Sequence, residues 1–163
     1  MISYEQSKKI LKKAKIKIKE EKINSIKSLN RVVSSNVYSN INYPTGDNAA
    51  FDGYAINSKD TNQIKKNSQK QFKIIGSIAA GSKPLKKKIK KFDAIEIMTG
   101  GIIPKGFDTI IPIEQINFYP NKKNKKYILI DHKISKYNHV RFAGSDYKKG
   151  EVIINKNTIV QPN

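Results

Sequence analysis

Residues 94–116, AIEIMTGGIIPKGFDTIIPIEQI, contain two isoleucine-rich runs with a glycine- and proline-rich link between them. Each run is short and rich in β-branched residues, which is typical of β-strands. The link interrupts the pattern because glycine adopts backbone conformations that other residues avoid, and proline cannot donate to a sheet ladder. This stretch predicts two strands joined by an irregular connection.

The same pattern of short apolar runs broken by glycine and proline continues through the middle of the chain from residue 42 onward. Further short runs rich in isoleucine and tyrosine are YAINS (54–58), FKIIGSI (72–78) and KYILIDH (126–132). Lysine-rich links separate them, and one link offers Asn121 and Asn124 for the positive φ of a hairpin turn. Several short strands at this spacing predict a small barrel or sandwich.

The two ends of the chain read differently from the middle. Ser3 and Gln6 have the spacing of a capping box, and apolar residues then recur on one face of a helix over residues 3–20, which we expect to pack on a core. A helical turn over Ser25–Leu29 would end at Asn30 in the left-handed conformation. The run RVVSSNVYS (31–39) predicts a strand, and an alternating strand closes the chain. 

These readings combine into an α+β fold that is mostly β. We expect a small β-barrel-like insert, residues 42–146, in a helix-plus-strand layer that both chain ends form, residues 1–41 and 147–163. Because strands of the insert would lie between the two ends in sequence, the outer layer is discontinuous.

The composition limits the classes of function. With 32 Lys+Arg against 13 Asp+Glu, the formal net charge is +19, which is typical of proteins that bind nucleic acid or an anionic membrane. Arginine is the residue that favours specific base contacts, and only Arg31 and Arg141 are arginines. Nucleic-acid binding is therefore the weaker alternative, and we attribute the excess of lysine to codon composition. The chain has no cysteine, which excludes disulfides and thiolate sites. No apolar run approaches the ~18 residues of a membrane span, and we expect a cytoplasmic protein.

One segment has no positive charge in this basic chain. Residues 46–56, GDNAAFDGYAI, contain Asp47 and Asp52, and no lysine occurs between Ser39 and Asn57. The two carboxylates either bind a hard cation such as Mg²⁺ or accept hydrogen bonds from their own loop. Their small neighbours leave the backbone open to a ligand or a partner chain.

Three further groups have an alternative of this kind. Thr99, Gly100 and the next glycine either present backbone amides and a hydroxyl to an anion or form a plain strand-to-turn connection. Arg141 either grips an anion in a bidentate way or pairs with Asp146. Glu114 is either a third acidic group of the site or a solvated residue, and from its position alone we favour the second. The two histidines are interpreted as solvated surface residues.

Four segments together resemble one family. DNAAFDGYAI, AAGSKP, EIMTGGIIPKGFDTIIPIE and VRFAGSDYKKGEVI occur in the order seen in the amino-terminal half of molybdopterin molybdenumtransferases, the MoeA-type enzymes and the related E domain of gephyrin. The resemblance covers the chain from about Glu21 onward. It implies insertion of molybdate into adenylylated molybdopterin with release of AMP, helped by Mg²⁺ or another divalent cation, in molybdenum-cofactor biosynthesis. It also implies a homodimer whose active site is shared between subunits, with the two chain ends as its linker and dimerisation layer.

The motif match assigns roles to five residues. Asp52 falls on the family's functionally important aspartate and Thr99 on the threonine of its MTG segment, so both are predicted to be catalytic. Asp47, Gly100 and Arg141 are predicted to bind substrate. No metal ligand is firmly assigned, and Asp52 is the one candidate.

The chain departs from the family in composition and in length. Glu96 stands where an arginine usually precedes the MTG segment, and Phe51 replaces a methionine. The family's catalytic α/β domain is expected after residue 163, so we expect this chain to be an incomplete half-site that is inactive alone. The alternatives are a non-enzymatic scaffold or binding module and a lysine-rich nucleic-acid-binding β-domain.

Overall fold

The structure is a computed structural model that describes residues 1–14, 18–82 and 87–162 of the chain. Contacts within the chain divide it into two units. The terminal unit combines Met1–Val37 with Val152–Asn163, and the central unit is Tyr38–Glu151.

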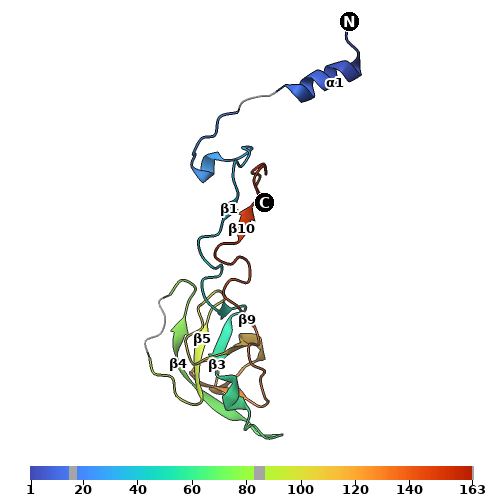
Figure 1. Cartoon of the computed structure of the whole chain (residues 1–163). Coiled ribbons are helices and arrows are strands. Elements are labelled where there is room, and N and C mark those ends of the chain that lie inside the picture. The colour runs from blue at the N-terminus through green and yellow to red at the C-terminus, as the bar shows by residue number, and fades with distance from the viewer. Residues whose placement is uncertain (15–17, 83–86, 163) are drawn as a thin grey trace. The chain divides into compact units, whose positions relative to one another are not determined.

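The central unit is built on one six-stranded sheet that curls into a half-barrel (Figure 1). The strand order is β6-β3-β5-β4-β8-β7. The strands are β3 (Gly53–Ile56), β4 (Lys70–Ile78), β5 (Asp93–Ile97), β6 (Thr109–Pro112), β7 (Asn117–Pro120) and β8 (Lys125–Ile130). All neighbours pair antiparallel except β4 and β5, which are parallel. The expected mostly-β, barrel-like fold is confirmed.

Both faces of the sheet are buried at β6, β3 and β5, and side chains alternate between the two faces along each strand. In β3, Tyr54 and Ile56 belong to one buried cluster, and Ala55 between them belongs to the other. The first cluster consists of Tyr54, Ile56, Phe72, Ala94, Ile111, Ile116, Ile128, Ile130 and Ile134. The second consists of Ala49, Ala55, Ile78, Ile95, Ile97, Phe107 and Ile110. Strand β3 is therefore buried on both sides and anchors the loop that precedes it.

Short elements complete the central unit. β2 (Asn48–Ala49) pairs antiparallel with β9 (Val140–Arg141), and two 3₁₀ turns, η2 (Ser58–Thr61) and η3 (Ile113–Gln115), follow β3 and β6. β3 and β6 approach so closely that a Cβ added at Gly53 would lie 2.0 Å from the carbonyl oxygen of Ile111. Only glycine fits at that position.

The terminal unit contains α1 (Tyr4–Lys13), η1 (Ser25–Lys27) and β10 (Val152–Ile154), and β1 (Val37–Tyr38) pairs with β10. The capping box at Ser3 and Gln6 is confirmed, since each side chain accepts a hydrogen bond from the other residue's backbone N–H, at 3.2 and 2.9 Å. Asn30 has a φ of 61°, as expected.

The helix expected over residues 3–20 is shorter than expected. It ends at Lys13, and Ala14 is already extended with a ψ of 110°, while residues 15–17 lie outside the described part. Repeated lysines three and four residues apart repel one another, and short helices are marginal without tertiary contacts. The expected packing of this helix on a core is wrong, because α1 has no buried residue and Leu11 is 74% exposed.

Two other local expectations are corrected. In the β7–β8 connection neither Asn121 nor Asn124 adopts a positive φ. Instead, Asn121 Oδ1 accepts hydrogen bonds from the backbone N–H of Lys123 and Asn124, at 3.0 and 2.9 Å, so its side chain shapes the turn. Of residues 31–39, only Val37–Tyr38 forms a strand. Val32 makes an isolated bridge to Ile159, and Val33 exchanges backbone hydrogen bonds with Asn157 and Thr158 without continuing the strand.

Candidate functional site

Asp52 and Thr99, which are 47 residues apart in sequence, meet at one corner of the sheet. β3 and β5 run antiparallel with Gly53 opposite Ile97, so the residue before β3 lies beside the turn after β5. Asp52 Oδ1 accepts two hydrogen bonds from Thr99, one from the backbone N–H at 2.7 Å and one from the hydroxyl at 2.6 Å. The structure thus brings together the two residues that the sequence predicts to be catalytic.

These hydrogen bonds favour the ionised form of the carboxyl group. The Thr99 hydroxyl, and after it the Thr99 backbone N–H, lower the pKa of Asp52 below its ordinary value. Both residues are exposed, so the ionised carboxylate faces solvent at neutral pH. Among the described residues only Oδ1 accepts hydrogen bonds, which leaves Oδ2 available to a cation or a substrate group.

The turn that carries Thr99 is held by its own amides. Gly100 N–H donates to the carbonyl of Ala49 at 2.8 Å, and Gly101 N–H donates to the carbonyl of Met98 at 2.8 Å. Gly100 has a φ of 79°, a conformation that favours glycine. Because all three amides of residues 99–101 donate within the chain, they do not form the open anion cradle that paired glycines suggested. A role for Gly100 in binding substrate stays a prediction.

Asp47 and Arg141 lie at a different point, where β2 pairs with β9. Asp47 Oδ1 accepts a hydrogen bond from Ala143 N–H at 2.9 Å, which ties the acidic segment to the turn after β9. Arg141 forms a hydrogen-bonded ion pair with Asp146, and this hydrogen bond raises the pKa of the guanidinium. Of the two alternatives for Arg141, the structure shows the pairing with Asp146. Asp47 and Asp52 thus contact different segments of the chain.

Two residues near Asp52 carried no signal in the sequence. Asn48 is 7% exposed, and its Oδ1 is buried without a hydrogen-bond partner in the described part of the chain. His139, interpreted from sequence as a solvated residue, instead packs its ring edge-on against Phe51, with 4.9 Å between ring centroids. Its carbonyl accepts a hydrogen bond from Ala50 N–H at 3.0 Å, so His139 supports the acidic segment. 

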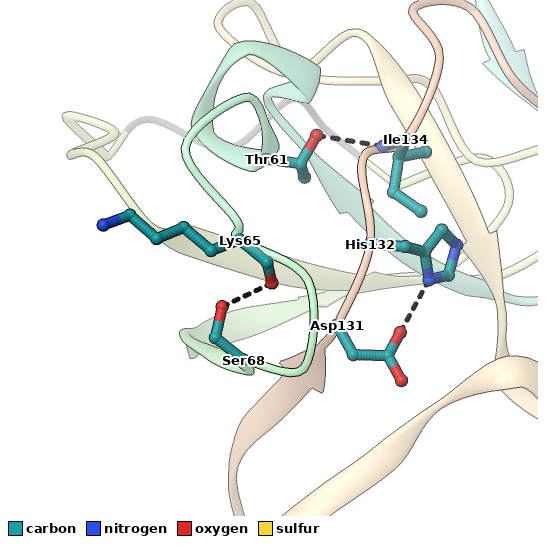
Figure 2. Close-up of polar contacts among 6 residues, drawn as sticks. All are labelled: Thr61, Lys65, Ser68, Asp131, His132 and Ile134. Carbon is teal, nitrogen blue, oxygen red and sulfur yellow. Dashed lines mark hydrogen bonds and ion pairs between the residues drawn. The ribbon is translucent and has the colours of Figure 1, made fainter.

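A wide hollow of about 830 Å³ lies elsewhere, between the loop at residues 64–69 and Asp131–His132 (Figure 2). It contains serine, histidine and aspartate side chains, the residue types of a nucleophilic triad. Their contacts do not form one, because the Ser68 hydroxyl donates to the carbonyl of Lys65 at 2.7 Å and His132 Nδ1 lies 2.6 Å from Asp131 Oδ1. Figure 2 shows the Ser68 hydroxyl directed toward Lys65 and away from the imidazole. None of the predicted site residues lines this hollow.

Two features are absent from the described residues. Within residues 1–14, 18–82 and 87–162, no three His, Cys, Asp or Glu side chains gather as a metal site. No helix in the same ranges has the length and apolar character needed to cross a membrane.

Comparison with known proteins gives one consistent answer. Residues 2–163 match the family described as the MoeA N-terminal region, domains I and II. Molybdopterin molybdenumtransferase from Haemophilus influenzae is 29% identical over 164 aligned residues, which cover 99% of this chain and 38% of the relative. The same enzyme from Bacillus subtilis is 28% identical over 135 residues, which cover 83% of this chain and 31% of the relative.

Solved structures agree with the sequence relatives. A molybdopterin biosynthesis moeA protein from Pyrococcus horikoshii OT3 superposes with a TM-score of 0.77 at 31% identity, over 87% of this chain and 36% of that one. A second structure of the protein from this organism gives a TM-score of 0.80 at 30% identity, over 98% of this chain and 39% of that one. The chain therefore spans between 31% and 39% of the length of these proteins.

Proposed function

Because the chain belongs to the family of MoeA N-terminal regions, we propose that it acts as the amino-terminal part of a molybdopterin molybdenumtransferase. Membership confirms the resemblance found in the motifs, and it connects the chain with molybdenum-cofactor biosynthesis. The observation that supports the proposal most is the hydrogen-bonded pair of Asp52 and Thr99, since both predicted catalytic residues meet at an exposed corner. The proposed reaction inserts molybdate into adenylylated molybdopterin and releases AMP.

In this proposal Asp52 contributes a fixed negative charge. Its Oδ1 is held by Thr99, so the carboxylate cannot rotate freely, and Oδ2 remains for a ligand. Magnesium binds through one or two carboxylates together with water and substrate phosphates, which one free carboxylate oxygen fits. When bound, Mg²⁺ or another divalent cation would neutralise developing negative charge at the phosphate. Thr99 orients Asp52 through two hydrogen bonds and holds its pKa below the ordinary value.

One carboxylate and one hydroxyl do not make a complete active site. We therefore propose that catalysis needs an α/β region supplied in addition to these residues, and that a second copy of the chain shares the site. The terminal unit supports dimer formation, because large apolar side chains are exposed over much of its length, including Leu11, Ile26 and Ile159 at 74%, 88% and 52%. A homodimer would remove part of this surface from water.

A chimera tests the proposal. Residues 1–163 would replace the matching region of the Bacillus subtilis relative, in a strain whose own transferase gene is deleted. We expect the chimera to restore the activity of a molybdenum-cofactor-dependent enzyme of the host, and Asp52→Asn to reduce it about 10²-fold because the oriented charge is lost.

Asp131→Asn is the matched control, because Asp131 is also exposed, with its pKa also lowered by a hydrogen bond, but it lies in the hollow of Figure 2. This variant should restore activity as well as the unmodified chimera. A stable, well-expressed chimera that restores nothing would contradict the proposed function.

A further inference from the structure

A second cavity lies in the central unit, and of the five predicted site residues it includes Asp47 alone. Its volume is about 380 Å³, and neither Asp52 nor Thr99 lines it. Three segments form its walls, namely η2, the link between β5 and β6, and the turn before β9. Each segment contributes one lysine, and these are Lys59, Lys105 and Lys136.

The charges in this cavity are unbalanced. Two carboxylates, Asp47 and Asp108, share the lining with the three lysines. Both oxygens of Asp108 accept hydrogen bonds from Ser58, from its N–H at 2.7 Å and its hydroxyl at 3.0 Å, while Asp47 Oδ1 accepts from Ala143 N–H. The carboxylates are thus largely engaged within the chain, and the ion pairs found in the described ranges involve none of the three lysines.

Two aromatic side chains, Phe107 and Tyr137, line the cavity together with the lysines; we call them the aromatic wall. Phe107 is 7% exposed and lies at the cavity, whereas Tyr137 is 47% exposed at its edge. The Lys136 ammonium lies 4.3 Å from the centre of the Tyr137 ring. The cavity therefore has two aromatic rings in its lining together with the three lysines, and one of these lysines contacts the Tyr137 ring.

The turn that carries Tyr137 is held in an unusual conformation. Tyr137 and His139 have φ values of 66° and 53°, which bulky residues rarely adopt. Two hydrogen bonds fix the turn, from Tyr137 N–H to the carbonyl of Asp108 and from Ile110 N–H to the carbonyl of Asn138, both at 2.9 Å. Strained backbone of this kind persists where surrounding contacts determine it, and it concentrates at ligand sites.

We propose that this cavity binds a phosphate monoester that carries a flat ring. Lysine is a common phosphate ligand that acts as a point charge, so three lysines suit a phosphate dianion. The ring of the ligand would lie against Tyr137 and Phe107, which provide the apolar contact. The site shares only Asp47 with the predicted transferase residues and contains neither Asp52 nor Thr99, and the three lysines and two rings that would hold the ligand have no part in the proposed transferase function.

Titration of the ¹⁵N-labelled full chain at low salt tests the site, with inorganic phosphate and phenyl phosphate as the two probes. We expect saturable shifts of the Gly106, Phe107 and Tyr137 amides with both probes. Phenyl phosphate should bind about tenfold more tightly, because the ring adds apolar contact that inorganic phosphate lacks. Shifts that never saturate, or shifts spread over the whole surface, would overturn the proposal.

Matched variants distinguish phosphate binding in this cavity from attraction by the overall positive charge of the chain. The triple variant Lys59→Gln, Lys105→Gln and Lys136→Gln should weaken phosphate binding at least about tenfold, since each lysine contributes a charged contact. The control triple variant Lys122→Gln, Lys123→Gln and Lys149→Gln removes the same charge outside the cavity and should bind normally. Equal weakening in both variants would show that only the overall charge matters.

Tyr137→Asn tests the aromatic wall, because asparagine tolerates the left-handed conformation while lacking the ring. We expect it to abolish the preference for phenyl phosphate and to leave inorganic phosphate binding unchanged. A retained preference would overturn the role of the ring. If the triple lysine variant fails to fold, Lys105→Gln alone, on an exposed link, should still weaken phosphate binding, and unchanged binding would overturn the proposal.

Discussion

Asp52 and Thr99 show how a few contacts at the residue scale define a site. The hydroxyl of Thr99 and its N–H converge on one oxygen of Asp52, at 2.6 and 2.7 Å. The other oxygen accepts no hydrogen bond within the described part of the chain, and Asp52 is exposed to solvent. A single turn therefore orients the carboxylate and lowers its pKa.

The first prediction concerns this carboxyl group. Thr99→Val removes the hydroxyl donor, so the pKa of Asp52 should rise toward its ordinary value of about 3.9. Thr99→Ser keeps the donor and should keep the lowered pKa. Carboxyl ¹³C NMR titration measures both. Because the folded-state pKa is lowered, the stabilising contribution is present above about pH 4 and is lost as the pH falls through the folded-state pKa. An unchanged Asp52 pKa in Thr99→Val would contradict the assignment.

The second prediction concerns Gly53. Alanine there would place Cβ 2.0 Å from the carbonyl oxygen of Ile111, so β3 and β6 must separate. We expect Gly53→Ala to lower the free energy of unfolding by about 3 kcal/mol or more. Chemical denaturation measures it. The control is Gly46→Ala, whose Cβ would meet only the Ile102 side chain, at 3.3 Å. This variant should lower the free energy of unfolding by less than about 1 kcal/mol.

Sequence reasoning identified Asp52 and Thr99 through their motifs, but spacing alone does not show that they touch. Their contact depends on the pairing of Gly53 with Ile97, which is a property of the sheet. The cavity lined by Lys59, Lys105 and Lys136 was not predictable for a related reason. In a chain with this many lysines, three of them far apart in sequence carry no distinguishing signal until the fold brings them together.

At the scale of elements, strands were more predictable than the helix. The β-branched runs at residues 72–78 and 94–97 lie in β4 and β5, because burial on a sheet favours such side chains strongly. The end of α1 was not predictable, because several small local contributions to helix stability decide where it lies and no buried contact extends the helix. The β7–β8 turn likewise depends on one side-chain contact of Asn121 that composition does not reveal.

The third prediction concerns α1. Ser3→Ala removes the capping hydrogen bond to Gln6 N–H, which should destabilise the helix by about 1 kcal/mol and reduce the helical circular dichroism signal. The melting temperature of the sheet should not change, because neither buried cluster includes a residue of α1. Thermal scans followed at helix- and strand-sensitive wavelengths measure the two effects. A parallel loss of sheet stability would show that α1 supports the core.

At the scale of the whole molecule, the core belongs to one unit. Both buried clusters consist of residues between Ala49 and Ile134, all within the central unit. The terminal unit instead exposes large apolar side chains, which is why we propose that a second copy covers them. We therefore propose that the chain provides part of a larger assembly.

The fourth prediction follows from this division. A fragment of residues 38–151 should fold by itself and give the dispersed amide spectrum of the full chain's central unit, because it keeps both clusters and every strand of the six-stranded sheet. Comparison of two-dimensional NMR spectra checks this. A collapsed, poorly dispersed spectrum would mean that the terminal unit is required for the core.

The most direct test of the central claim is AMP release from adenylylated molybdopterin by the purified chimera, with molybdate and Mg²⁺ supplied. We predict that Asp52→Asn slows AMP release about 10²-fold, that Thr99→Val slows it about tenfold, and that Thr99→Ser and Asp131→Asn keep the original rate. A folded Asp52→Asn chimera that releases AMP as fast as the unmodified chimera would contradict the account.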